Sequence, residues 1–128
     1  MAFPNEACGL LIGLHTEAGW RVIDVVDAPN ITSKDPTQFF EIDPKALFEA
    51  HRGARAAKDG RDVIGFYHSH PTSEAVPSEF DQLQAHEAGK VWVILGGHDG
   101  SGGPSAWHIK AWVSGQAVGA AFQSVEIC

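Results

Sequence analysis

The stretch GFYHSHP (residues 65–71) places two histidines, His68 and His70, two positions apart directly after an apolar run. The preceding residues 62–68 are typical of a β-strand, and residues i and i+2 of a strand point to the same face. Both imidazoles can therefore converge on one point, whereas Ser69 between them points away. A single histidine at a strand end is commonly a half-buried polar residue, but a pair on one face favours a shared ligand.

A carboxylate completes this pair. Asp81 follows eleven residues after His70, near the start of a helix predicted over residues 78–88. Two imidazoles and a carboxylate suit zinc, and catalytic zinc sites take three protein ligands and leave a fourth position for water. A structural zinc is more often closed by four ligands, usually cysteines, and neither Cys8 nor Cys128 has the spacing for that. The sequence therefore predicts one zinc per chain, held by the two histidines and Asp81.

Two further residues could serve the chemistry of such a site. Glu6 lies just before the first predicted strand, residues 7–14, where partial burial would raise its pKa into the range useful for acid–base catalysis. Ser78 lies one helical turn before Asp81, so its hydroxyl could stabilise an oxyanion. The pair also fits a variant of the capping box, with Ser78 as N-cap and Asp81 as the N3 residue. Capping would compete with the catalytic role of Ser78 and leave a metal role for Asp81 open.

Hydrophobic patterning predicts one mixed α/β domain without repeats or linkers. Strands are expected at residues 7–14, 21–28, 39–42, 62–68, 90–97, 105–113 and 116–127, the last two as a hairpin. A helix is expected over 44–59, with Asp43 as N-cap and Gly60 as its stop, and another over 78–88, closed by Gly89. Loops are expected at 30–38, 69–77 and 98–104.

The composition is that of an acidic globular protein. The 128 residues are 44% hydrophobic and carry a formal net charge of −7. Such a charge disfavours binding to nucleic acid or to an anionic membrane surface, because both rely on cationic side chains. No stretch approaches the roughly 20 apolar residues of a membrane span, and no basic region precedes the first apolar run. With only two cysteines, the sequence predicts a cytoplasmic protein without a signal peptide.

Taken together, these motifs resemble the JAMM (MPN+) metalloprotease family. The resemblance covers nearly the whole chain and rests on EACGLLIG (6–13), FEIDP (40–44), GFYHSHP (65–71) and PSEFD (77–81). The spacing of the two histidines, the serine and the aspartate is highly specific. The resemblance implies a deaminase-like α/β core, a single mixed sheet flanked by helices, and one catalytic domain over residues 1–128.

The resemblance also implies a zinc-dependent peptidase or isopeptidase. It assigns zinc ligands (His68, His70 and Asp81), a general acid/base (Glu6) and an oxyanion stabiliser (Ser78). Small prokaryotic members are associated with cleavage at the C-terminus of ubiquitin-like, sulfur-carrier proteins, so such a protein is the expected substrate and partner. Two alternatives stay open, namely a non-catalytic MPN scaffold that only binds partners and a RadC-like hydrolase of another substrate.

The N-terminus departs from the family pattern. Family members usually carry a further segment before the glutamate, whereas only MAFPN precedes Glu6 here. We therefore expect the usual N-terminal helix to be missing and apolar surface to be exposed beside CGLLIG (8–13). A large apolar patch usually marks an interaction site, so this predicts a homo-oligomer or the uptake of a partner's helix on that face.

Overall fold

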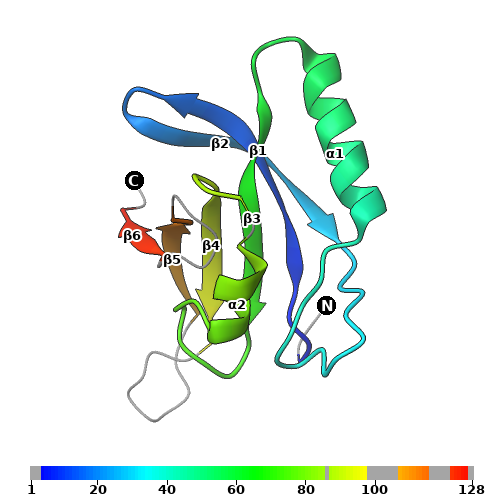
Figure 1. Cartoon of the computed structure of the whole chain (residues 1–128), viewed down its shortest axis with the longest axis vertical. Coiled ribbons are helices and arrows are strands. Elements are labelled where there is room, and N and C mark those ends of the chain that lie inside the picture. Colours follow the sequence, from blue (N-terminus) through cyan, green and yellow to red (C-terminus); the bar gives the residue numbers. More distant parts are fainter. Residues whose placement is uncertain (1–3, 86, 98–106, 116–121, 127–128) are drawn as a thin grey trace.

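The computed structural model describes residues 4–85, 87–97, 107–115 and 122–126, in which six strands form one mixed sheet (Figure 1). The strands are β1 (Cys8–Thr16), β2 (Gly19–Ala28), β3 (Asp62–His70), β4 (Val91–Gly96), β5 (His108–Val113) and β6 (Gln123–Val125). Their order across the sheet is β2-β1-β3-β4-β5-β6. Only β3 and β4 pair in parallel, and the other neighbours are antiparallel. With the helices α1 (Pro44–Ala57) and α2 (Glu79–Gln84), the predicted single mixed sheet is confirmed.

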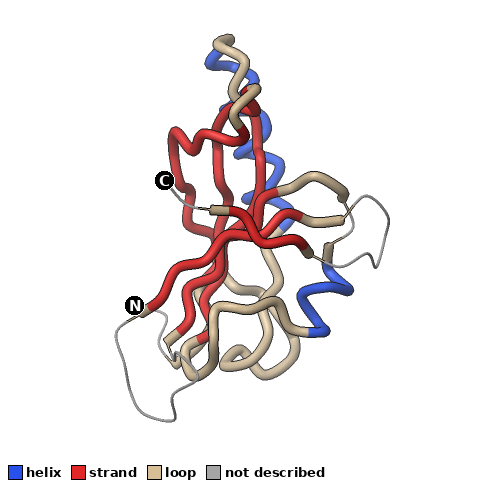
Figure 2. The backbone as a smooth tube through the Cα atoms, turned by 90° about the vertical axis from the view of Figure 1, so that its left-hand side faces the viewer, coloured by secondary structure: helices blue, strands red, loops and turns tan. Residues whose placement is uncertain are grey.

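One face of the strongly twisted sheet, called the helix face below, contacts both helices (Figure 2). Leu10 of β1 and Val63 of β3 form a buried cluster with Ala54 of α1. His68 of β3 meets Asp81 of α2 further along the same face. The helix face therefore holds the main core at its α1 end and a polar cluster at its α2 end.

A β-bulge in β3 decides which side chains reach the helix face. Leu11 pairs with Gly65, whereas Ile12 pairs with Val63, which leaves Ile64 as the extra residue. Ile64 then packs with Leu11 on the opposite face of the sheet. Without the bulge, the two-residue alternation of a strand would place Ile64 on the same face as the two histidines.

The opposite face contacts no helix within the described ranges. Leu11, Ile64 and Val91 form a small buried cluster there, and Leu11 is only 3% exposed. The apolar exposure expected beside residues 8–13 falls instead on the adjacent strand β2, where Val22 and Val25 are 44% and 52% exposed. Self-association, or the uptake of a partner's helix on this face, stays a prediction.

The strand predicted at residues 39–42 is wrong, and one asparagine explains why. This segment makes only an isolated bridge, between Asn30 and Ile42. The Asn30 amide donates to the Phe39 carbonyl at 3.0 Å, and its oxygen accepts the Glu41 N–H at 3.0 Å. A side chain thus takes the backbone hydrogen bonds that a neighbouring strand would otherwise satisfy.

Both helices end earlier than predicted. Asp43 caps α1 as expected, but the helix stops at Ala57, with Lys58 rather than Gly60 in the left-handed conformation that closes it (φ 53°). α2 is confined to Glu79–Gln84 instead of 78–88. Conversely, β3 runs to His70 and includes two residues of the predicted loop 69–77.

The C-terminal part of the chain is described only in segments. β5 and β6 pair antiparallel, as the predicted hairpin requires, although β6 covers only Gln123–Val125 of the expected 116–127. Residues 98–106, which contain the predicted loop 98–104, and residues 116–121 lie outside the described ranges. Neither α1 nor α2 has the length and apolar character needed to cross a membrane, nor does any other described segment form such a helix.

Candidate metal centre

Three polar side chains meet on the helix face at the C-terminal end of β3. The His68 Nε2 atom lies 3.0 Å from His70 Nε2 and 3.0 Å from Asp81 Oδ2. His70 Nε2 lies 3.1 Å from the same carboxylate oxygen. All three residues are buried, with exposed fractions of 0%, 6% and 2%. We call this arrangement the His–His–Asp triangle.

The donor set of the triangle fits a zinc ion. Two Nε2 atoms at 3.0 Å leave room for only one hydrogen between them, so the contact cannot be a pair of mutual N–H donors. Tetrahedral ligands at about 2.0–2.1 Å from zinc lie roughly 3.3 Å from one another, which is close to the separations observed. Imidazole nitrogen and carboxylate oxygen are also ligands that zinc accepts. A cation at the centre would satisfy all three groups at once.

Interactions behind the histidines fix their orientation. His70 Nδ1 lies 2.9 Å from the Glu74 carbonyl oxygen, which can only accept, so Nδ1 carries a proton. In the neutral imidazole, Nε2 then presents a lone pair to the triangle. Such an outer hydrogen bond commonly orients metal-binding histidines. The His68 ring stacks on Phe40 with centroids 4.3 Å apart, and its buried Nδ1 has no hydrogen-bond partner among the described residues.

The start of α2 positions the carboxylate of the triangle. Ser78 Oγ accepts the Asp81 N–H at 3.0 Å, and Asp81 Oδ2 accepts the Ser78 N–H at 2.9 Å, so the capping box is formed. The expected competition with catalysis does not follow, because a hydroxyl that accepts one hydrogen bond still has its own proton to donate. Ser78 is exposed, so this proton is accessible from outside the protein.

The charge states of Asp81 and His68 suit a metal site, whereas that of His70 does so only after loss of a proton. Burial alone would raise the pKa of Asp81, but hydrogen bonds from His68 and His70 outweigh burial and hold this pKa well below its usual range. Burial lowers the pKa of His68, which keeps its imidazole neutral. His70 differs, because its hydrogen bonds to Asp81 and to the Glu74 carbonyl raise its pKa despite burial. A metal ion must therefore displace the Nε2 proton of His70. A charged carboxylate and neutral imidazoles are the forms that bind metal.

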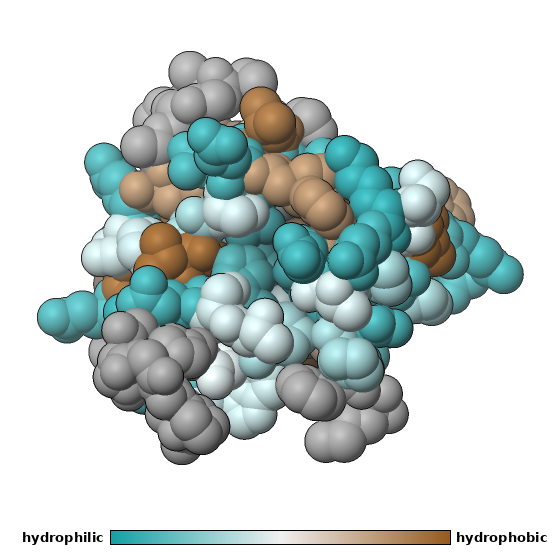
Figure 3. Space-filling view, turned by 90° about the horizontal axis from the view of Figure 1, so that it is seen from below, coloured by the Kyte–Doolittle hydropathy of each residue, from teal (hydrophilic) through white to brown (hydrophobic). Residues whose placement is uncertain are grey.

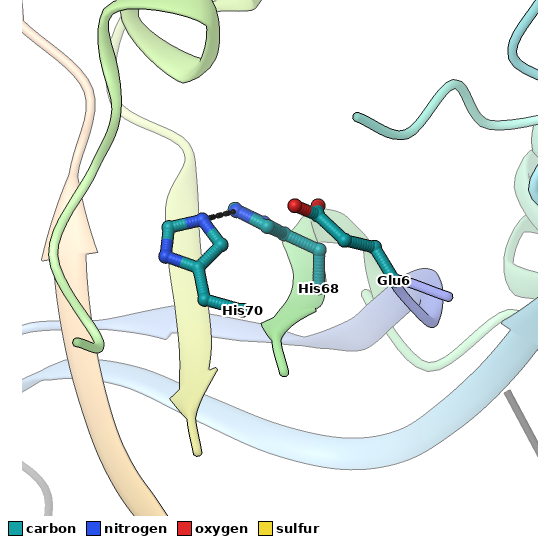
Figure 4. A group of neighbouring side chains, drawn as sticks. All are labelled: Glu6, His68 and His70. Carbon is teal, nitrogen blue, oxygen red and sulfur yellow. Dashed lines mark hydrogen bonds between the residues drawn. The ribbon is translucent and has the colours of Figure 1, made fainter. Parts of the chain in front are cut away.

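A second carboxylate approaches the same histidines from the segment before β1 (Figure 4). Glu6, His68 and His70 offer ligand atoms that all lie within 4.8 Å of one another, and Glu6 is only 5% exposed. Burial raises the pKa of Glu6 to about 7, although the charge of His70 opposes the rise. By distance alone, Glu6 could replace Asp81 as the third ligand. Asp81 is the better candidate because one of its oxygens contacts both histidines directly.

The raised pKa of Glu6 should cost stability in the metal-free protein. The folded-state pKa lies above the value of 4.5 that is usual for a free glutamate, so wild-type stability falls as the pH rises from about 4.5 to about 7. Glu6→Gln should therefore have a higher free energy of unfolding than wild type near pH 8, by up to roughly 3 kcal/mol. Below about pH 4.5 the two free energies of unfolding should be equal. Denaturant titrations of metal-stripped protein test this, with the exposed Glu17→Gln as control. An equal change at both pH values would contradict it.

Sequence reasoning missed the contacts that hold Glu6. The Glu6 N–H donates to the Pro36 carbonyl at 2.7 Å, and the Asn30 amide donates to the Glu6 carbonyl at 3.2 Å. Ser69 makes two bonds to the next residue: its Oγ accepts the Ala7 N–H at 2.7 Å, and its own N–H donates to the Ala7 carbonyl at 2.9 Å. Strand alternation predicted only that Ser69 turns away from the two histidines. Asn30 and Pro36 lie in a loop that carried no spacing signal.

The surface around this end of the molecule is mainly hydrophilic. Figure 3 views the molecule from the end at which β3, β4 and α2 lie, and separate hydrophobic residues interrupt a largely polar surface. Beside the triangle, Phe39 packs edge-on against Phe80 of α2, and Lys34 lies over both rings at 5.2 and 5.1 Å. These contacts tie the loop after β2 to the helix that carries Asp81.

Comparison with known families identifies the domain that carries this site. The sequence profile of the family described as prokaryotic homologues of the JAB domain matches residues 1–112. The chain belongs to this family. The matched range contains all five residues singled out from the sequence, namely Glu6, His68, His70, Ser78 and Asp81. The expected membership of the JAMM/MPN group is therefore confirmed.

Similar proteins include two curated relatives of this JAB-domain chain. A desampylase of Haloferax volcanii is 33% identical over 91 residues, which cover 71% of this chain and 62% of the relative. A probable TtuB-protein conjugate cleaving protease of Thermus thermophilus is 31% identical over 97 residues, which cover 76% of this chain and 59% of the relative. The chain thus spans about three-fifths of the length of each.

A solved structure supports the fold of the JAB-domain chain. The solution structure of protein DSY2949 from Desulfitobacterium hafniense superposes with a TM-score of 0.78 and 28% identity. The superposition covers 99% of this chain and 80% of that protein.

Proposed function

We propose that this JAB-domain protein is a zinc-dependent peptidase or isopeptidase that cleaves at the C-terminus of a ubiquitin-like protein of the sulfur-carrier type. The observation that carries the proposal is the buried His–His–Asp triangle with the Glu6 carboxylate beside it. The names of the two curated relatives, a desampylase and a TtuB-protein conjugate cleaving protease, support cleavage of ubiquitin-like protein conjugates.

The proposed roles follow from position. His68, His70 and Asp81 would hold zinc, which when bound supplies Lewis-acid activation of a water molecule and of the scissile carbonyl. Glu6 takes the proton from the attacking water and then passes it to the leaving amine, a use for which a carboxyl pKa raised by burial is suited. The exposed Ser78 donates its hydroxyl proton to the oxyanion while its oxygen caps α2.

The first expected result concerns metal content. The protein should bind about one zinc per chain, because the site offers three ligands and one open position. Elemental analysis of purified protein, followed by zinc titration after chelation, measures this. Protein that carries no zinc and takes none up on titration would contradict the proposed zinc dependence, and with it the proposed function.

A cleavage assay separates the proposed function from its alternatives. The zinc-loaded protein is incubated with a ubiquitin-like protein that carries a C-terminal extension after its terminal diglycine. Cleavage that stops on chelation and returns with zinc supports the peptidase. Binding of the fusion without cleavage would support a scaffold, and zinc uptake with neither binding nor cleavage would favour a RadC-like hydrolase of another substrate.

A further inference from the structure

We propose that Asn30 is the positioning residue for Glu6, and that it acts through the backbone of Glu6 rather than by touching substrate or metal. The inference rests on the proposed role of Glu6 as general acid/base. It is carried by hydrogen bonds that join Asn30 to three separate segments, namely residues before β1, the loop after β2, and the residues that lead into α1.

Every polar atom of the Asn30 side chain is engaged in these bonds. Its Nδ2 donates to the carbonyls of Glu6 at 3.2 Å and of Phe39 at 3.0 Å. Its Oδ1 accepts the N–H groups of Thr32 at 3.2 Å and of Glu41 at 3.0 Å. An amide has two donor hydrogens and two acceptor lone pairs, so all four positions are used. Such a satisfied side chain holds one rotamer and can fix its partners relative to one another.

One of these partners connects Asn30 to the candidate metal centre by a second route. Phe39 precedes Phe40, which is 5% exposed and stacks on the His68 ring. The Asn30 amide therefore ties the backbone of Glu6 to the segment that packs behind His68. This link sets the separation between the Glu6 carboxylate and the two histidines of the triangle. Proton transfer requires that such a separation be held to within a fraction of an ångström.

The Glu6 side chain itself gains little from other contacts. No hydrogen bond to its carboxylate is found among the described residues, and the charge of His70 is the main interaction that opposes its burial. Its position therefore depends on the backbone, which Pro36 holds at the N–H, Asn30 at the carbonyl and Ser69 at the next residue. Ser69 adjoins His68 in β3, whereas Asn30 is the one of the three that also bonds the Phe39–Phe40 segment packed against the His68 ring.

Two substitutions separate positioning from general loop stability. Asn30→Asp keeps an oxygen for the N–H groups of Thr32 and Glu41 but replaces the donor with a second oxygen, so the bonds to Glu6 and Phe39 are lost. Asn30→Ser has a shorter side chain with one donor hydrogen and no charge, so it cannot bond both the Glu6 and Phe39 carbonyls, and it serves if Asn30→Asp does not fold. Thr32→Ala is the matched control, because within the described part of the chain its hydroxyl bonds only the Lys34 N–H in the same loop.

The first readout needs no activity. Amide hydrogen exchange at Glu6 and Ala7 should accelerate by about 10-fold in Asn30→Asp, the change expected at this segment when the bond to the Glu6 carbonyl, of about 1.4 kcal/mol, is lost. Zinc content should equal that of wild type, and Thr32→Ala should leave these two amides unchanged. Exchange rates equal to wild type in both Asn30 variants would overturn the proposal.

The second readout is a double-mutant cycle. With wild-type Glu6, Asn30→Asp should lower kcat by about 10–100-fold and change KM little. A loss of this size is typical when a residue that orients a functional group is substituted. With Glu6→Gln, the same change should have no further effect, because the group that it positions is gone. An equal loss in both backgrounds would overturn the proposal. If wild type cleaves no substrate, the proposed function fails, and the exchange measurement alone decides the role of Asn30.

Discussion

Glu6→Gln is expected to lower kcat/KM by about 10²–10⁴-fold while the protein keeps its zinc, because general acid–base catalysis typically contributes that factor. Glutamine preserves the shape of the side chain but cannot accept and return the proton. The comparison is made on zinc-loaded protein, with Glu17→Gln as an exposed control. Metal analysis accompanies each assay.

Two outcomes would contradict the role assigned to Glu6. If Glu6→Gln cleaves as fast as wild type, Glu6 is not the base. If the variant loses zinc, Glu6 is a ligand, as its distance from His68 and His70 would allow.

Asp81→Asn is expected to weaken zinc binding by about 100-fold or more, because even changes behind the ligands typically cost 10–100-fold in metal affinity. The substitution removes the negative charge and places an amide where one oxygen now contacts both histidines. Competition with a chromophoric chelator measures the affinity. Asp59→Asn is the matched control, since Asp59 is exposed and its one ion pair with a described residue is to Arg61. Unchanged zinc affinity in Asp81→Asn would remove Asp81 from the ligand set.

The meeting of the histidines with Asp81 could be predicted because it depends on local rules. The period of a strand puts His68 and His70 on one face, and the start of a helix places Asp81 within reach of both. The same rules identified Asp43 as the cap of α1 and residues 90–97 as the strand that became β4.

Other features could not be predicted, because they depend on contacts between distant segments. The bulge at Ile64 is set by the β1–β3 register, which no local pattern reveals. The failure of residues 39–42 to form a strand follows from the Asn30 side chain. α1 ends at a left-handed Lys58 although a glycine stands two positions later, so residue preference alone gave the wrong boundary.

The position of Glu6 illustrates the same limit at the site. Its chemistry could be inferred from one carboxylate before an apolar strand, whereas its burial and its raised pKa depend on the loop after β2 and on Ser69. A sequence pattern identifies the reactive group, but the contacts that orient it are spread over segments without a shared spacing.

The intact mass of the products formed from a ubiquitin-like fusion in ¹⁸O-labelled water tests the central claim most directly. The account predicts cleavage after the terminal diglycine by zinc-loaded protein, with one ¹⁸O atom in the new carboxylate, since water is the nucleophile. Metal-stripped protein and Glu6→Gln should leave the fusion intact over the same period. Cleavage by the metal-stripped protein, or a product without the label, would contradict the account.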